Sequence, residues 1–354
     1  MRTQLGVIGF GGVAICCAAF LGVADVAAQR GASPNRTLTA VAGIRVGHHT
    51  LSERPTGCTV ILVDGDAVGG VSQRGGAPGT RETDLLDPLN MVDKVNAVVL
   101  AGGTAFGLDA ATGTVRWLEE HNIGWQTRWG RVPIVPAAIL IDLGVGDNPR
   151  VRPTADCGYR AAASAGSAPV SEGSIGAGAG ATVGKFAGGR AMKGGVGSAA
   201  ITLPNGLVVA AIVAVNAAGD IIDPRTATIV AGALKPDGTF VDARALLRSG
   251  GVVQPPTPGE NTTIGVVATN ARLTKAEAGR MALMADDGLA RAIYPSHTPG
   301  DGDTIFSLAT GRWDGQVSIS VIGALAADAL AEAIVRAATE ATGVAGIPAR
   351  RDLR

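Results

Sequence analysis

The sequence predicts a mixed α/β or α+β protein with a large β-sheet content. Continuous apolar runs that end at glycine indicate buried strands, and apolar residues spaced three and four apart indicate helices. The two kinds of segment intermix along the chain without a fixed-period repeat. Of the 354 residues, 52 are glycine and 46% are hydrophobic, which favours a tightly packed globular protein built on small side chains.

The charge of the chain argues against two classes of partner. Lys and Arg total 30, as do Asp and Glu, so the formal net charge is zero. A balanced charge gives no electrostatic footprint for nucleic acid or for an anionic membrane, and we expect neither partner. The chain has no CxxC or HExxH motif, so we also expect no metal and no cofactor.

Residues 1–28 are predicted to form a signal peptide. A basic residue precedes a glycine-rich apolar run, and Val26 and Ala28 fit a cleavage site after Ala28. An uncleaved anchor is the alternative, but the run is barely long enough to span a bilayer. Cleavage would place the protein in the periplasm or outside the cell, with no stable membrane partner. The two remaining cysteines, Cys58 and Cys157, could pair in such an oxidising compartment.

The first half of the chain alternates between strand and helix. Residues 58–65 and 96–103 are typical of buried strands that end at glycine. Residues 104–124 predict a helix with Thr104 as its N-cap and a glycine at its end. Its apolar stripe consists of Leu108, Ala111, Val115 and Leu118. Residues 132–144 return to the strand pattern.

The second half contains the plainest break in the chain, a Gly- and Pro-rich stretch that ends at Gly259. The elements around it are predicted as a strand at 207–222, a strand at 262–270, a helix at 274–293, strands at 301–310 and 315–325, and a helix at 326–342. The helix at 274–293 has the strongest start signal, because Thr274 and Glu277 have the spacing of a capping box.

Several common catalytic motifs are absent. The glycine-dense residues 173–199 lack a P-loop, because no Ser or Thr follows Lys185, and the GxGxxA match at 176–181 is a weak signal. Close backbone packing is the favoured explanation for these glycines. No GxSxG motif occurs, which argues against an α/β-hydrolase nucleophile elbow. A lone histidine such as His297 is more typical of a structural role.

Asp301 and Asp303 allow two interpretations. Composition favours an exposed Asp-Gly-Asp turn. If the segment is extended, both carboxylates point to one side, and burial of the pair would raise the pKa of one of them. The second interpretation suits acid–base chemistry but requires a nucleophile.

Thr262 can supply that nucleophile without a histidine. A cut before this residue would leave an α-amine, with a pKa of about 8, beside the residue's own hydroxyl. A threonine with a free α-amine is a recognised activated nucleophile. The hydroxyl could also make the cut itself, by attacking the carbonyl of Asn261.

The segment ENTTIGVVATNARLTKAEAGRMALMADDGLARAIYPSHTPGDGDTIFSLAT resembles the small-subunit region of the L-aminopeptidase/D-esterase family. That family includes β-peptidyl aminopeptidases and nylon-oligomer hydrolases. Earlier stretches agree in the family's order: VAGIRVGHHT, GCTVILVDG, LAGGTAFGLDAATGTVRWLEE, PIVPAAILIDL and GAGAGATVGKFAGGRAMKGGVGSA. The resemblance covers nearly the whole mature chain. It implies an α+β fold, a four-layer αββα sandwich of the self-processing N-terminal-nucleophile hydrolase type.

The resemblance also implies where the chain is cut. Cleavage between Asn261 and Thr262 would give a large subunit, 29–261, and a small subunit, 262–354, that together form one structural domain. Thr262 would then be the catalytic nucleophile. Thr263 would take that role only if the cut fell one residue later.

Further site residues follow from the same resemblance. Asp301 and Asp303 stand where many family members have a Ser-x-Glu pair, as in the nylon-oligomer-hydrolase version of the site. Asn216 matches an asparagine that stabilises the oxyanion, and Lys185 matches a lysine near the nucleophile. Phe106 and Gly107 are expected to line the substrate pocket or to pack the core.

The predicted function is a self-processing amide hydrolase, an aminopeptidase acting on short peptides, amino-acid amides or esters. Endo-hydrolysis of linear oligoamides is the first alternative. An acyltransferase and a non-catalytic binding protein of the same fold are two more distant alternatives. The resemblance further implies a homo-oligomer of processed units.

Overall fold

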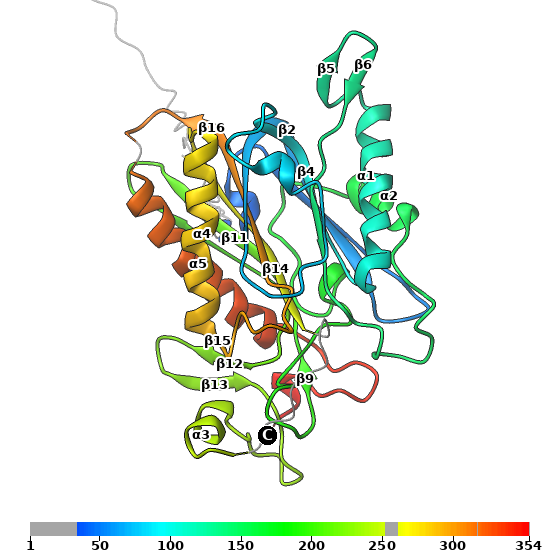
Figure 1. Ribbon diagram of the computed structural model, residues 1–354, viewed down its shortest axis with the longest axis vertical. Coiled ribbons are helices and arrows are strands. Elements are labelled where there is room, and N and C mark those ends of the chain that lie inside the picture. The colour runs from blue at the N-terminus through cyan, green and yellow to red at the C-terminus, as the bar shows by residue number, and fades with distance from the viewer. Residues whose placement is uncertain (1–33, 252–260, 317, 354) are drawn as a thin grey trace, which may run out of the picture. The chain divides into compact units, whose positions relative to one another are not determined.

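A computed structural model describes residues 34–251, 261–316 and 318–353 of the protein (Figure 1). The chain divides into two units, Met1–Pro34 and Asn35–Arg354, and all elements below belong to the second. The predicted signal peptide at 1–28 lies outside the described residues. No helix in the described ranges is both long enough and apolar enough to cross a membrane.

The main sheet has nine strands, in the order β10-β11-β14-β16-β2-β4-β7-β3 with β1 paired to β2. These strands are β1 (Ile44–Thr50), β2 (Gly57–Gln73), β3 (Thr80–Arg81), β4 (Lys94–Ala101), β7 (Ala137–Ile139), β10 (Gly195–Thr202), β11 (Val208–Asn216), β14 (Thr262–Ala271) and β16 (Thr304–Trp313). The helices are α1 (Asp109–Glu120), α2 (Ala155–Ala163), α3 (Ala243–Arg248), α4 (Lys275–Ala292) and α5 (Ile319–Thr339).

Shorter elements complete the described chain. The small strands are β5 (Trp125–Thr127), β6 (Gly130–Val132), β8 (Thr182–Val183), β9 (Met192–Lys193), β12 (Asp220–Asp223), β13 (Thr228–Ala231) and β15 (Ile293–Tyr294). The 3-10 turns are η1 (Leu38–Ala40), η2 (Asp84–Leu86), η3 (Thr104–Leu108), η4 (Gly176–Gly178) and η5 (Arg350–Asp352).

Strand β2 joins the two halves of the sheet. Its first half, residues 57–63, pairs with β1 and β4, whereas residues 68–73 pair with β16. The pairing with β4 is irregular between Leu62 and Ala67, around Gly65, whose positive φ of 87° suits a residue without a side chain. Because β2 changes its pairing partners at this irregularity, the single hydrogen-bonded sheet forms two layers that face each other.

Alternating side chains show that the two halves pack face to face. In β11 and β14, Ile212 and Val266 contribute to the same core as Ile61 of β2 and Leu100 of β4. The opposite faces of the strands pack against helices, with α4 and α5 on one half and α1 and α2 on the other (Figure 1). The predicted four-layer αββα sandwich is therefore confirmed.

The start of α4 follows the sequence signal. The Thr274 side chain accepts a hydrogen bond from the backbone N–H of Glu277, whose carboxylate accepts one in return, completing the predicted capping box. By contrast, Thr104 is not the N-cap predicted for the preceding helix. It has a left-handed φ of 53° in η3, with its N–H bonded to the Leu140 carbonyl, and α1 begins only at Asp109.

The strand predicted at 315–325 is wrong, because α5 begins at Ile319. The alternating pattern there is local, whereas Ile322, Ala326 and Leu330 continue at helical spacing and are buried against the sheet. Two other predicted strands are shorter or divided. Within 132–144, the strand residues are Val132 at the end of β6 and the three residues of β7. The predicted strand at 207–222 divides into β11 and β12.

Cys58 at the start of β2 and Cys157 of α2 form a disulfide between positions 99 apart in the sequence, with Cα atoms 6.2 Å apart. Closing so long a loop restricts the unfolded chain. We expect the double replacement Cys58→Ala and Cys157→Ala to lower the free energy of unfolding by about 2–4 kcal/mol. Urea unfolding measures this effect. The same loss should appear in the unchanged protein after reduction, and identical midpoints would contradict the prediction.

Candidate active site

Thr262 lies at the start of β14, in the middle of the sheet. On one side it pairs with Asn216, the last residue of the antiparallel strand β11. On the other side, β16 runs parallel to β14, and the segment just before β16 bridges Asn261 to Asp301. Sheet pairing thus brings three predicted site residues to one point. Thr262 is only 2% exposed and Asn261 is fully buried.

Two hydrogen bonds hold the carbonyl oxygen of the Asn261–Thr262 peptide group. The Thr262 hydroxyl donates a hydrogen bond to the Asn261 carbonyl oxygen, so the hydroxyl lies beside the group that it would attack. The same carbonyl accepts the N–H of Gly302 at 2.9 Å. A donor on a carbonyl oxygen favours negative charge there, as an oxyanion hole does.

Asp303 holds the start of β14 in place. One carboxylate oxygen accepts the Thr263 N–H at 2.8 Å, and the other accepts the His297 N–H at 3.0 Å. The second oxygen also lies 3.0 Å from Nδ1 of His297. These hydrogen bonds fix the orientation of the Asp303 carboxylate, and the bond to the Thr263 N–H fixes the backbone next to Thr262.

Asp301 lies on the other side of Gly302. Its carboxylate accepts the Thr298 N–H at 2.7 Å, while its backbone carbonyl accepts the N–H of Ala77. Asp301 and Asp303 are both buried, so the exposed turn that composition favours is wrong. Burial, and then the nearby charge of Asp303, raise the pKa of Asp301.

Lys185 and Asn216 form the opposite side of the site. The Lys185 ammonium lies 3.1 Å from both the backbone and the side-chain oxygen of Asn216. The side-chain oxygen also accepts the Thr182 N–H, and the side-chain nitrogen donates to the Ile141 carbonyl at 2.9 Å. These contacts fix the orientation of the Asn216 side-chain amide, and Asn216 itself pairs with Thr262 in the sheet.

Comparison with known proteins identifies the family to which the chain belongs. The model of "Peptidase family S58" matches residues 36–351, nearly the whole described chain. The chain belongs to peptidase family S58. This membership confirms the resemblance seen in the sequence and the expectation of a hydrolase.

Relatives and solved structures of similar fold agree with the S58 assignment. The chain is 45% identical to an uncharacterised aminopeptidase of Mycobacterium leprae, covering 90% of this chain and 94% of the relative. It is 30% identical to a 6-aminohexanoate-oligomer endohydrolase of an Agromyces species, covering 83% and 84%. The solved L-aminopeptidase D-Ala-esterase/amidase of Ochrobactrum anthropi, described as a variant of the Ntn hydrolase fold, aligns with a TM-score of 0.65 at 21% identity, covering 87% of each chain.

Phe106 and Gly107 stand apart from the other predicted S58 site residues. No hydrogen bond or ion pair among the described residues ties them to the Thr262 cluster. Phe106 is 56% exposed, with the Arg152 guanidinium 3.7 Å from its ring centre, so it does not pack in the core. Gly107 is buried where a Cβ would meet the Gly102 carbonyl, so this position needs glycine for close packing.

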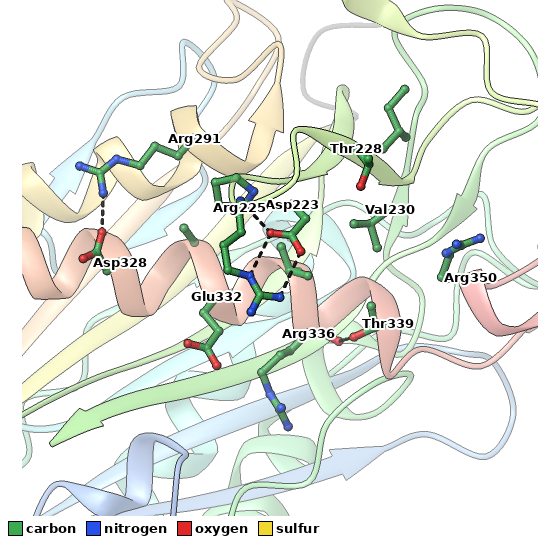
Figure 2. Close-up of a pocket in the computed structure, with 14 residues that line it drawn as sticks. Asp223, Arg225, Thr228, Val230, Arg291, Asp328, Glu332, Arg336, Thr339 and Arg350 are labelled. Atoms are coloured by element: carbon green, nitrogen blue, oxygen red, sulfur yellow. Dashed lines mark hydrogen bonds and ion pairs between the residues drawn. The ribbon is translucent and has the colours of Figure 1, made fainter.

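A cavity of about 690 Å³ lies away from this cluster, beside β12, β13 and α5 (Figure 2). Its charged side chains include two close pairs, Arg225 with Asp223 and Arg291 with Asp328. None of the lining residues belongs to the Thr262 cluster. The candidate S58 site, whose residues Asn261 and Thr262 are buried, is therefore separate from this cavity.

Three residues were not predicted from the sequence as part of the site or its surroundings: Gly302 and His297, which contact it, and Asp286, which lies behind it on α4. Gly302 acts through its backbone, which sequence motifs do not show. The sequence favours a structural role for His297, although this residue precedes Asp301 and Asp303 in the same short segment. The burial of Asp286 could have been predicted, because this residue falls on the apolar face of α4 together with Ala282 and Leu289.

Gly302→Ala tests how closely its neighbours hold the Asn261–Thr262 bond, the predicted site of cleavage. A Cβ at this position would lie 2.8 Å from both the Thr262 hydroxyl oxygen and the Ala77 carbonyl oxygen. We expect chain cleavage to slow by about 10- to 100-fold, because the reacting groups would be displaced. Timed denaturing gels measure the rate. Gly279→Ala on α4, where a Cβ meets no atom within 4 Å, is the matched control and should cleave normally.

Proposed function

We propose that the protein is a self-processing aminopeptidase that uses Thr262 as an N-terminal nucleophile. The observation that carries this proposal is the contact of the Thr262 hydroxyl with the Asn261 carbonyl, which also receives the Gly302 N–H. The proposed substrates are short peptides, amino-acid amides or esters.

Processing would begin when the Thr262 hydroxyl oxygen attacks the Asn261 carbonyl carbon. The hydroxyl proton passes to the Thr262 nitrogen as the C–N bond breaks, leaving an ester between Asn261 and Thr262. Water then hydrolyses this ester. The products are a carboxylate on Asn261 and a free amine on Thr262, and the Gly302 N–H stabilises the charge that develops on the carbonyl oxygen.

In turnover, the Thr262 amine would take the proton from its own hydroxyl as that hydroxyl attacks the substrate carbonyl. Asn216 lies opposite Thr262 in the sheet register, where its amide can donate to the substrate oxyanion. A single donor of this kind contributes about 3 kcal/mol to the transition state. Lys185 supports that role by holding the Asn216 side chain. Water finally releases the acyl group from Thr262.

The same geometry suggests how substrate selection would arise. Because Asn261 is fully buried beside Thr262, its departure after cleavage would open the space next to the nucleophile. Asp301 and Asp303 border that space, and a buried carboxylate favours a substrate ammonium group. This charge preference supports an exopeptidase that removes an amine-bearing N-terminal residue.

Endo-hydrolysis of linear oligoamides is the second candidate. It is favoured by the use of Thr262 with Asp301 and Asp303, and by the 30% identity to a 6-aminohexanoate-oligomer endohydrolase. Both reactions would use the same nucleophile and differ in how much substrate extends on the amine side of the cut bond.

Two measurements test the proposal. A denaturing gel of the purified protein should show two chains, and N-terminal sequencing of the smaller should begin at Thr262. A single full-length band that persists on incubation rejects the self-processing mechanism. Rates on amino-acid amides, β-peptides and 6-aminohexanoate oligomers then choose between the two candidates. Preference for blocked-amine oligomers would reject the aminopeptidase.

We also propose that the protein is exported and assembles as a homo-oligomer of processed units. The Cys58–Cys157 disulfide supports export, because such bonds persist in oxidising compartments. Fractionation of cells and light scattering of the purified protein test these two points.

A further inference from the structure

A buried carboxyl group lies one layer behind the site. Asp286 is on the face of α4 that packs against the sheet, and it is only 2% exposed. Neither of its carboxyl oxygens forms a hydrogen bond of ordinary geometry with the described residues. Among the described residues, its ion-pair partner is Arg74, whose Nε lies 3.7 Å from one carboxyl oxygen. A buried carboxyl with so few partners is costly unless a charge nearby compensates it.

His297 contacts Asp303, one of the carboxylates of the site. Asp303 accepts the backbone N–H of His297 and lies 3.0 Å from its Nδ1, so one carboxylate oxygen contacts the residue twice. His297 also has a left-handed φ of 56°, an uncommon conformation for a residue with a side chain. Contacts that maintain such a conformation are often functional.

We propose that His297 is a positioning residue of the active site. Through its contacts with Asp303, it holds that carboxylate directed at the N–H of Thr263, and the buried carboxyl of Asp286 acts on His297 as a second negative group. The inference deepens the proposed function, on which its catalytic consequence rests.

The electrostatics agree with this geometry. Burial lowers the pKa of His297, but the contact with Asp303 and the charges of Asp303 and Asp286 outweigh it, so the pKa is raised above 6.5. Burial raises the pKa of Asp286 to about 6, against the opposing effects of Ser72, His297 and Arg74. Two further charges act at the site among the described residues: the charge of Asp303 raises the pKa of Asp301, and the charge of Lys185 lowers it.

The pH dependence follows from the sign of these shifts. His297 carries its charge below its raised pKa and loses it as the pH rises through that value. Asp303 then loses its cationic partner, and its hold on Thr263 weakens. Self-cleavage should therefore slow on the alkaline side. Cleavage isolates this effect, because the Thr262 α-amine does not yet exist in the uncut chain.

The first test is an NMR titration of the histidine rings. The chain has four histidines, and the signal lost in His297→Gln identifies this one. We expect a pKa above 6.5 in the unchanged protein and a fall of about one pH unit in Asp286→Asn. Asp287→Asn, an exposed neighbour on α4, is the matched control and should leave the titration unchanged. A wild-type value at or below 6.5, or equal titrations in the two Asn variants, overturns the proposal.

The second test follows the consequence at the site. The alkaline limb of the self-cleavage rate should move down by about one pH unit in Asp286→Asn, as the His297 titration does, and stay in place in Asp287→Asn. Hydrogen exchange of the Thr263 amide should accelerate over the same pH range. If the ring titration shifts while both readouts stay unchanged, His297 is not a positioning residue. If the wild type never cleaves, the proposed function fails, and the titration and amide exchange still decide this inference.

Discussion

Thr262→Ala should leave the chain uncut and abolish amide hydrolysis. The replacement removes the only hydroxyl that contacts the Asn261 carbonyl among the described residues, and with it the atom that would form the acyl-enzyme. Loss of a nucleophile costs on the order of 10⁴- to 10⁶-fold in turnover. Gel analysis, N-terminal sequencing and rates on an amino-acid amide measure the two effects together.

The neighbouring threonine supplies the control. The Thr263 hydroxyl is buried and forms no hydrogen bond with the described residues, so Thr263→Val removes no such bond. This variant should be cut at the same place as the unchanged protein, and Thr262→Ser should also be cut because it keeps a hydroxyl. Cleavage of Thr262→Ala together with an uncut Thr263→Val would move the nucleophile by one residue.

Asp303→Asn should reduce both self-cleavage and turnover by about 10²- to 10³-fold. The change removes the charge that His297 faces and weakens the acceptor for the Thr263 N–H. Breaking one partner of a buried charged pair costs about 3–5 kcal/mol, part of which would appear in the rates. Single-turnover cleavage and steady-state rates at several pH values measure the loss.

A stability measurement separates this effect from unfolding. Asp314→Asn, at an exposed position, is the matched control and should change neither the rates nor the unfolding midpoint. Asp303→Asn should remain folded at the assay temperature while its rates fall. Unchanged rates in a folded Asp303→Asn protein would show that this carboxylate does not serve the site.

Many elements of the fold and of the site could be predicted from the sequence, because the patterns that predict them span only a few residues. The capping box at Thr274, the glycine-bounded strand in β2 and the strand after Asn261 are each encoded within a few residues. The αββα layering came from the family resemblance, since periodicity alone left α/β and α+β open. The resemblance also named Asn216, which pairs with Thr262 in the sheet, and Lys185, which contacts Asn216.

The errors arose where long-range contacts decide the structure. The alternating residues after 315 enter a helix because α5 packs on the sheet, and Thr104 follows a turn fixed by the Leu140 carbonyl. The roles of Asp286 and His297 depend on the approach of α4 to the segment before β16. No local sequence pattern predicts that α4 packs close to this segment.

The strand order would determine whether the two chains separate after the proposed cleavage before Thr262. In the sheet, β14 and β16 of the small chain lie side by side, flanked by β11 and β2 of the large chain. Separation would require both outer ladders to open and the cores shared with β11 and β2 to be exposed to water. Dissociation would therefore amount to global unfolding, so the two chains should migrate as one particle until the protein denatures.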